Sequence, residues 1–353
     1  MGMIGLADAL MPLARLLPPE TAHGLAVQAL ARHRATSAPD DPILATTRWG
    51  LKFPNPVGLA AGFDKDARAF AGALGLGFGF VEIGSVTPMP QLGNPQPRLF
   101  RVPELRAVVN RMGFNSEGHN AAARRLEHRD RTRGIVGINL GKNKDQNDAA
   151  ADYVAGVRAL GPLADYLVVN VSSPNTAGLR DLQGRQALEA LLARVLPARD
   201  ALINKPPLLL KIAPDLDEGA RDDIAAVALA ARIDGLIVSN TTVARPATPQ
   251  RTHRHLAETG GLSGRPLFVP SNEILADMYR RTGGKITLVG VGGIESGRGA
   301  YMKIRAGASL VQLYTALIYG GPGLVARIKR ELAACLRRDG FESVDAAVGA
   351  DHK

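Results

Sequence analysis

Short apolar stretches typical of buried β-strands recur along the chain, and helical patterns fill most of the intervals between them. Eight such stretches lie at residues 57–60, 80–84, 135–140, 166–171, 208–212, 235–239, 286–291 and 309–313. The helical patterns lie at 67–74, 118–128, 149–160, 186–199, 219–231, 269–282, 296–306 and 322–338. This repetition predicts an α/β fold, a (β/α)8 TIM barrel. The connection 88–114 is too long for an ordinary turn and is expected to be a functional loop or lid.

Residues 1–38 precede this pattern and form a separate unit with two helical patterns. The first is short and strongly apolar, and it ends at Pro18 and Pro19. Such a helical hairpin can pack on the main fold, or it can lie in a membrane interface and admit an apolar ligand. The pattern alone favours packing. We expect a helical extension at 1–38, a barrel at 43–340 and a C-terminal tail at 341–353.

Composition narrows the functional classes. The chain has 353 residues and a formal charge of +10, which suits nucleic acid, an anionic membrane surface or anionic small ligands. No basic run carries interleaved aromatic residues, so a solvated basic surface is favoured over nucleic-acid binding. The single cysteine excludes an internal disulfide and a cysteine-based metal site. No window reaches the ~18 apolar residues of a membrane span, and no signal peptide is expected.

Polar residues gather where the predicted strands end. In the stretch 165–175 (DYLVVNVSSPN) an apolar run opens into Asn and Ser residues, and Pro174 stops the strand. In α/β barrels this edge holds the ligand site. Asn side chains both donate and accept, as a planar ring with alternating N–H and C=O groups requires. One Asn at a strand end would more often be a helix cap, but four of them beside two Lys favour a binding site.

The last two units carry a second pattern. Gly292 and Gly293 follow the seventh predicted strand, and Thr315 follows the eighth. Many barrels bind phosphate at this place through backbone N–H groups and a helix N-terminus, although a plain glycine-rich turn is the alternative. No Asp, Glu or His cluster has metal-ligand spacing, so no metal is expected. No G-x-G-x-x-G opens a βαβ unit, which argues against a dinucleotide domain.

Nine motifs, in the order found here, resemble the membrane-associated, quinone-linked class (class 2) of dihydroorotate dehydrogenase. They lie at residues 58–65 (GLAAGFDK), 95–98 (PQPR), 110–115 (NRMGFN), 137–142 (GINLGK), 170–176 (NVSSPNT), 210–215 (LKIAPD), 238–242 (VSNTT), 260–264 (GGLSG) and 290–294 (GVGGI). The resemblance implies an FMN-binding barrel that oxidises (S)-dihydroorotate to orotate in de novo pyrimidine (UMP) synthesis. Electrons would pass to a membrane quinone.

Residue by residue, the resemblance implies that Ser173 is the base that takes the C5 proton, while the C6 hydride goes to flavin N5. Lys211 would stabilise the reduced flavin. The implied substrate-binding residues are Lys65, Asn110, Arg111, Met112, Gly113, Phe114, Asn170, Asn175, Asn240 and Thr241. The implied FMN-binding residues are Ala60, Ala61, Gly62, Lys65, Ser85, Asn139, Asn170, Lys211, Ser239, Gly264, Gly293, Tyr314 and Thr315. The quinone tunnel would use Leu10, Leu13, Leu17 and His23.

Other classes remain to be separated. The soluble class of the family uses a Cys base, but Cys335 lies outside every motif. A tRNA-dihydrouridine synthase is also an FMN barrel, yet it would need a Cys acid and an RNA-binding domain. A non-enzymatic phosphate- or nucleotide-binding barrel would leave Ser173 and the Asn residues without a purpose. The extension at 1–38 is short and shows no transit peptide or membrane span, so we expect a bacterial dehydrogenase, monomeric and held peripherally on the cytoplasmic side of the inner membrane. No nucleic-acid partner is expected.

Overall fold

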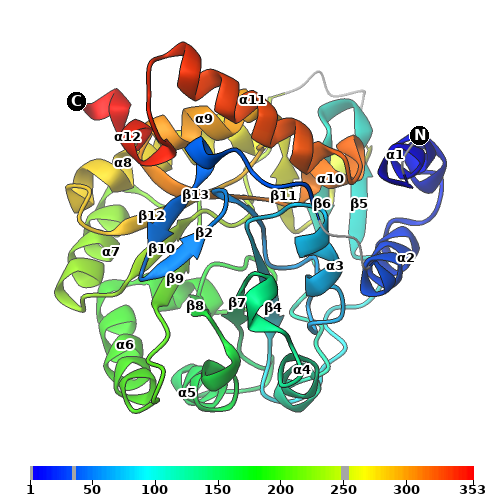
Figure 1. Cartoon of the computed structure of the whole chain (residues 1–353). Helices are drawn as coiled ribbons and strands as arrows, with labels where there is room; N and C mark the ends of the chain where they lie inside the picture. The colour runs from blue at the N-terminus through cyan, green and yellow to red at the C-terminus, as the bar shows by residue number, and fades with distance from the viewer. Residues whose placement is uncertain (1–2, 34–36, 248–253) are drawn as a thin grey trace.

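Eight parallel strands close into a barrel in which the last strand pairs with the first (Figure 1). In order around the barrel they are β3 (Val57–Leu59), β4 (Phe80–Val86), β7 (Ile135–Leu140), β8 (Tyr166–Asn170), β9 (Leu208–Ile212), β10 (Gly235–Val238), β12 (Thr287–Val291) and β13 (Ala308–Leu313). This computed structural model describes residues 3–33, 37–247 and 254–353. The predicted fold is confirmed, and each predicted strand is present to within two residues at either end.

Helices cover the outside of the barrel and bury their apolar faces against the strands. They are α3 (Phe70–Gly75), α4 (His119–Leu126), α5 (Ala149–Leu160), α6 (Arg185–Asp200), α7 (Glu218–Ala230), α8 (Phe268–Thr282), α9 (Gly297–Arg305), α10 (Thr315–Gly320), α11 (Leu324–Arg338) and α12 (Val344–Ala347). The N-caps Asp148, Asp217 and Ser296 accept hydrogen bonds from backbone N–H groups three residues later, which fixes three helix starts.

The interior of the barrel is apolar at its lower end, where the strands begin, and polar above this, toward the C-terminal ends of the strands. Phe80, Tyr166, Leu209 and Leu310 belong to a buried cluster that fills the lower end. Successive side chains of a strand point to opposite faces, so the next inward position lies two residues further along. Several of these positions are polar: Glu82, Asn170, Lys211, Ser239 and Gln312. The inward-facing residues early in the strands therefore form an apolar plug, and those that follow form a polar layer above it.

Two small sheets lie outside the closed barrel, and neither was predicted. The hairpin of β1 (Thr46–Arg48) and β2 (Leu51–Phe53) lies against the apolar plug, and Trp49 donates to the Asp234 carbonyl at 2.8 Å. The antiparallel sheet of β5 (Leu99–Val102), β6 (Ala107–Asn110) and β11 (Gly261–Gly264) lies at the other end. The expectation of a long loop or lid at 88–114 was therefore wrong in part, since β5 and β6 lie within it. Their third strand, β11, is remote in sequence, so no local pattern revealed the sheet.

The two N-terminal helices, α1 (Met3–Ala14) and α2 (Pro19–Arg32), lie together at one edge of the molecule (Figure 1). Helix α1 contacts α10, and α2 contacts α3 and β5. Arg101 donates to the carbonyls of Arg15 and Leu17 at 2.8 Å each, and Arg98 pairs with Glu20 at 2.6 Å. Yet several leucines remain exposed: Leu10, Leu13, Leu16, Leu17 and Leu25.

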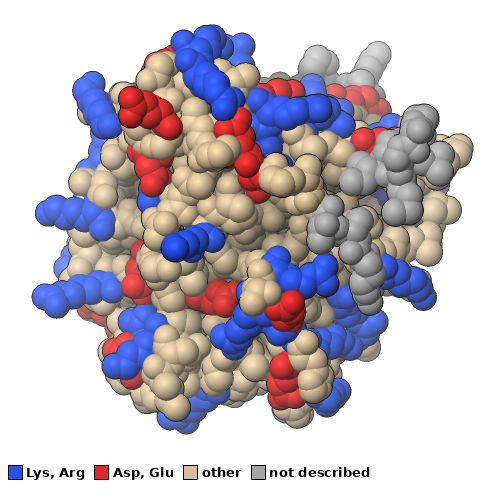
Figure 2. All heavy atoms as spheres, in the orientation of Figure 1, with Lys and Arg blue, Asp and Glu red and all other residues tan. Residues whose placement is uncertain are grey.

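Short 3₁₀ turns connect these elements: η1 (Pro42–Leu44), η2 (Pro103–Leu105), η3 (Arg131–Arg133), η4 (Gly161–Leu163), η5 (Leu179–Gln183), η6 (Arg254–Ala257), η7 (Arg265–Leu267) and η8 (Ala350–His352). Within the described ranges, no helix has both the length and the apolar character needed to cross a membrane. Figure 2 shows Lys and Arg spread over the visible face with Asp and Glu among them, rather than gathered in one basic stripe.

Candidate active site

One cavity opens at the C-terminal ends of the barrel strands, between these ends and the β5–β6–β11 sheet. Most of the site residues predicted from the sequence line it: His23, Ala60, Ala61, Gly62, Lys65, Ser85, Asn110, Met112, Gly113, Phe114, Asn170, Ser173, Asn175, Lys211, Ser239, Asn240, Thr241, Gly264, Gly293, Tyr314 and Thr315. The fold thus brings together side chains that are spread over nearly three hundred positions of the chain.

Five predicted site residues lie outside this lining. Asn139 pairs in register with Val168, so it lies one step below Asn170 in the barrel. Arg111 adjoins Asn110 on extended chain and points the other way, where it pairs with Glu258 at 2.7 Å. Leu10, Leu13 and Leu17 lie in or next to α1, beside the cavity rather than in it.

A polar layer forms the floor of the cavity. Glu82 is fully buried and accepts hydrogen bonds from Asn139 at 2.9 Å, Gln312 at 2.7 Å and Tyr166 at 3.2 Å. Asn139 also accepts from the hydroxyl of Ser85, and Asn170 donates to that hydroxyl at 3.0 Å. Because the amides of Asn139 and Asn170 are each held by several partners, their donor and acceptor ends have fixed directions. This layer can therefore present an ordered edge to a planar polar ring.

Ser173 lies in the loop after β8, and only 7% of it is exposed. Its hydroxyl oxygen accepts a hydrogen bond from the backbone N–H of Asn175 at 3.2 Å. The side chain of Asn175 donates to Asn110 at 3.2 Å, and Asn110 donates to the Gly261 carbonyl at 3.3 Å. Three separate parts of the chain are thus tied together around the Ser173 hydroxyl. Among the described residues, no carboxylate or imidazole is hydrogen-bonded to it.

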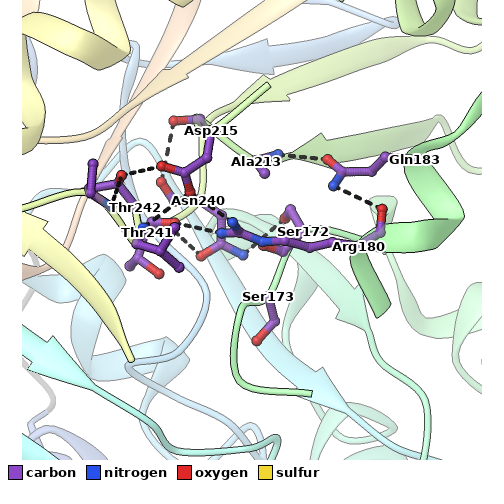
Figure 3. A network of polar contacts seen from close by, with 12 residues as sticks. Ser172, Ser173, Arg180, Gln183, Ala213, Asp215, Asn240, Thr241 and Thr242 are labelled. Atoms are coloured by element: carbon purple, nitrogen blue, oxygen red, sulfur yellow. Dashed lines mark hydrogen bonds and ion pairs between the residues drawn. The ribbon is translucent and has the colours of Figure 1, made fainter. Parts of the chain in front are cut away.

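Arg180 joins the Ser173 loop to the loops that follow β9 and β10 (Figure 3). Its guanidinium donates to the Ser172 carbonyl at 3.0 Å, to Asp215 at 2.7 Å and to the Thr241 carbonyl at 3.0 Å. Asn240 donates to the Ser172 hydroxyl at 2.9 Å. Figure 3 shows the Ser173 side chain pointing away from this network. The network ties the backbone at Ser172 to the backbone at Thr241, and the Ser173 hydroxyl takes no part in it.

Two lysines bring positive charge to the cavity. Lys65 donates to the Gly62 carbonyl at 2.8 Å, and burial lowers the pKa of Lys65 to about 8, although Asp66 opposes the shift. Burial also lowers the pKa of Lys211, an effect that the charge of Glu82 opposes. Lys211 is only 5% exposed and forms no hydrogen bond with the described part of the chain. A buried ammonium without a partner favours an anionic or electron-rich ligand beside it.

Glycines and hydroxyl groups line another part of the cavity. Gly264 and Gly293 have φ of +95° and +70°, and a methyl group on Gly293 would lie 2.6 Å from Phe268, so only glycine fits here. The hydroxyls of Ser263 and Thr315 lie 2.8 Å apart. Backbone N–H groups, two hydroxyls and nearby arginines are the donors that a phosphate group requires.

His23 of α2 lies where the cavity meets the N-terminal helices. Its Nδ1 lies 3.3 Å from the Tyr314 hydroxyl, and its ring stands edge-on to Phe63 at 5.3 Å between centroids. Burial, and then the charge of Lys65, lower the pKa of His23 to about 3. The imidazole is therefore neutral at physiological pH and joins the cavity to α2 through a polar contact.

Comparison with known sequences decides the family. The sequence profile described as "Dihydroorotate dehydrogenase" matches residues 43–336, which span the whole barrel. The chain belongs to the dihydroorotate dehydrogenase family. A relative from Rhodospirillum rubrum, named dihydroorotate dehydrogenase (quinone), is 58% identical over 97% of this chain and 94% of its own length. The mitochondrial dihydroorotate dehydrogenase (quinone) of Mus musculus is 57% identical over 98% of this chain and 90% of its own.

Solved structures agree with this assignment. The crystal structure of the Eimeria tenella dihydroorotate dehydrogenase in complex with ferulenol superposes with a TM-score of 0.92 at 43% identity. The superposition covers 95% of this chain and 96% of the Eimeria tenella chain. Relatives named for the quinone-linked class align with nearly all of this chain, so it belongs to that class.

The dihydroorotate dehydrogenase cavity also contains charged and polar residues that the motifs did not single out. Arg106 and Arg265 both pair with Glu295, at 2.7 and 2.8 Å, beside the glycine loop. Ser263 and Gln312 line the cavity as well. A signal for Gln312 exists in the sequence, because it interrupts an apolar strand two residues after Leu310. No comparable signal exists for Arg106, whose position depends on the small antiparallel sheet. Within the described residues, no group of His, Cys, Asp and Glu is placed to hold a metal.

Proposed function

We propose that this chain is a dihydroorotate dehydrogenase that oxidises (S)-dihydroorotate to orotate through FMN and passes the electrons to a quinone, in de novo pyrimidine (UMP) synthesis. One observation carries the proposal. A single cavity joins a glycine-lined anion site, a floor of fixed amides and the Ser173 hydroxyl. These three parts suit a flavin phosphate, a flavin ring and a proton transfer from a bound substrate, in that order.

The residues present fit FMN. Gly264, Gly293, Tyr314 and Thr315 would hold its phosphate end, and Ala60, Ala61 and Gly62 leave room for a flat ring against the backbone. Ser85, Asn139, Asn170 and Ser239 would support the ring from the polar floor. The buried ammonium of Lys211 favours negative charge on the flavin. When bound, FMN supplies the acceptor for the hydride that leaves C6 of dihydroorotate.

The substrate would lie above this ring. Asn110, Asn175, Asn240 and Thr241 offer amide and hydroxyl groups that match the alternating N–H and C=O edge of dihydroorotate. The Lys65 ammonium would pair with the substrate carboxylate. Arg111, which pairs with Glu258, would hold the segment Met112, Gly113 and Phe114 against the cavity. These contacts orient C5 of the substrate toward Ser173.

Ser173 would take the C5 proton as general base. A neutral serine hydroxyl is a weak base, so its own proton must pass to a water molecule as its oxygen takes the C5 proton, and the negative charge that develops on this oxygen must be stabilised. The backbone N–H of Asn175, which already donates to Ser173 Oγ at 3.2 Å, supplies such stabilisation at the reacting atom. The burial of Ser173 excludes bulk water and strengthens this interaction.

The extension at 1–38 would admit the quinone. Exposed leucines on α1 and in the turn after it, including Leu10, Leu13 and Leu17, would face the membrane surface, and His23 would line the end of the path at the cavity. We propose a monomer that is held peripherally on the cytoplasmic side of a bacterial inner membrane. Residues 43–340 would be the catalytic domain and 341–353 its C-terminal tail, in which Val344 and Ala347 are buried.

Stopped-flow absorbance tests the proposal directly. The purified protein is mixed with dihydroorotate, first alone and then with a short-chain quinone. Rapid loss of the oxidised flavin absorbance, followed by quinone-dependent recovery, is expected. A flavin that dihydroorotate does not reduce would reject the dehydrogenase and leave a tRNA-dihydrouridine synthase as the next candidate. Recovery with fumarate but not with quinone would keep the substrate and reject the quinone-linked class.

A further inference from the structure

Lys303 is a fully buried lysine that the proposed reaction does not use. It lies on α9 with 0% of its surface exposed, and its stem packs near Gly290 of β12. Its ammonium donates to the Ser271 hydroxyl and to the Asn272 side-chain oxygen, both at 2.8 Å, and lies 5.4 Å from the centre of the Phe268 ring. No Asp or Glu of the described chain pairs with it.

A buried ammonium without a carboxylate is unfavourable. Removing a charge from water is strongly unfavourable unless an opposite charge lies close by. This cost is visible in the pKa of Lys303, which burial lowers to about 7. An apolar side chain would fill the same space without this cost. A nearby anion that the chain itself does not provide would account for the lysine.

The lysine lies directly behind the anion end of the cavity. The Ser271 hydroxyl, which accepts from Lys303, lies 3.2 Å from the Gly292 carbonyl and 3.0 Å from the Phe268 carbonyl. Gly292 and Gly293 line the cavity, and Phe268 supports Gly293 from behind. One hydroxyl group therefore separates the buried ammonium from the peptide that would contact a phosphate.

The charges at this end of the cavity do not balance a phosphate without Lys303. Arg106 and Arg265 share one carboxylate, that of Glu295, and so leave one net positive charge. A phosphate monoester carries about −1.5 to −2 charges at pH 7. One further cation close to the site brings the balance near neutrality.

We propose that Lys303 is a positioning residue for the flavin phosphate, a buried counter-charge that acts through Ser271 and the Gly292–Gly293 peptide. This inference rests on the proposed use of FMN. The ammonium orients the Ser271 hydroxyl, and the hydroxyl can donate to the Gly292 carbonyl. Such a chain of hydrogen bonds polarises the peptide and makes the Gly293 N–H a stronger donor. The positive charge also attracts the phosphate through an interior that screens it weakly.

Flavin exchange on the holoprotein tests the proposal. The protein is equilibrated with mixtures of FMN and riboflavin, which lacks the phosphate, and the bound flavins are separated and quantified. The ratio of the two affinities reports the phosphate interaction alone, because any loss of protein stability affects both flavins equally. Lys303→Met should reduce the preference for FMN by about tenfold, the change expected for one shielded unit charge. Ser271→Ala should reduce it by a smaller factor.

Lys285→Met is the matched control, since it removes the same charge from an exposed position before β12 and should leave the preference unchanged. An unchanged preference in Lys303→Met would overturn the proposal. If that variant does not fold, Lys303→Gln removes the charge and retains a hydrogen-bond donor, and an unchanged ratio there would overturn the proposal equally. Should neither fold, an unchanged ratio in Ser271→Ala rejects it. A wild-type protein that binds neither flavin would instead reject the use of FMN, which is a separate outcome.

Discussion

The guanidinium of Arg180 donates at 3.0 Å to the carbonyl of Ser172, which belongs to the peptide bond that joins Ser172 to the proposed base Ser173. The same group reaches the Thr241 carbonyl and Asp215, so one side chain sets the distance between the base and a substrate-binding loop. Displacing a reacting group by about 1 Å can cost ~10²-fold in rate. We therefore expect Arg180→Met to slow flavin reduction by dihydroorotate about 100-fold.

The positioning role of Arg180 must be distinguished from a general loss of structure in the variant. Arg180→Met should keep its bound flavin and its rate of reoxidation by quinone, because neither depends on the hydrogen bonds of Arg180. Arg194→Met is the control. Arg194 lies on α6 and forms an exposed ion pair with Asp148, so its loss should leave flavin reduction unchanged. Stopped-flow measurement of both half-reactions gives these rates. Equal rates of flavin reduction in Arg180→Met and the wild type would contradict the positioning role.

Ser173→Ala removes the proposed base and leaves the backbone N–H of Asn175 in place. We expect flavin reduction to slow by about 10²–10⁴-fold, the usual contribution of general base catalysis, while quinone reoxidation stays unchanged. Substrate deuterated at C5 should then show a larger isotope effect than in the wild type, because proton removal limits the rate more strongly. A variant that reduces its flavin at the wild-type rate would exclude Ser173 as the base.

The pKa of Lys65, lowered by burial to about 8, predicts how orotate binding depends on pH. The ammonium pairs with the carboxylate only while protonated, which means below this pKa. The affinity for orotate should therefore be constant near pH 7 and should weaken as the pH rises through 8 to 9. Titrations of the flavin absorbance with orotate measure this without any turnover. Lys65→Met should bind orotate weakly at every pH and lose the dependence, whereas an unchanged profile would assign the titration to another group.

Most of the barrel and much of the cavity could be predicted from the sequence, for a physical reason. A buried parallel strand requires a continuous apolar run, and a change from apolar to polar residues, as at Asn170, marks the end where the cavity opens. The level of each side chain in the barrel depends on register, which the sequence does not state. Asn139 was therefore expected in the cavity, although it lies in the polar layer below.

Residues that depend on non-local pairing could not be predicted. Arg106 reaches the cavity because β6 pairs with β11, more than 150 positions later in the chain. Lys303 is buried because α8 packs beside α9, and no feature of its own helical pattern indicates this burial. Both positions follow from tertiary packing, which local periodicity does not encode.

Close packing at the lower end of the barrel predicts a strong effect on stability at Gly137. A methyl group there would overlap the ring of Tyr166, which belongs to the apolar plug and cannot move without displacing its neighbours. Gly137→Ala should lower the free energy of unfolding by about 1–3 kcal/mol. Gly24→Ala adds the same methyl group within α2, where nothing lies within 4 Å, and should raise stability by about 0.5–1 kcal/mol. Urea denaturation of the two variants compares them directly, and equal effects would show that the ring of Tyr166 can yield.

The exposed leucines of α1 predict how the protein reaches its quinone. Leu10 and Leu13 are 48% and 62% exposed, although both are apolar, so an interface with lipid would bury them favourably. Replacing both with Asp should raise the KM for a long-chain quinone in vesicles several-fold and leave flavin reduction by dihydroorotate unchanged. Ile203→Asp is the control, because Ile203 is fully exposed in the turn after α6. If the α1 variant and the control have the same KM for the long-chain quinone, α1 does not contact the membrane during turnover.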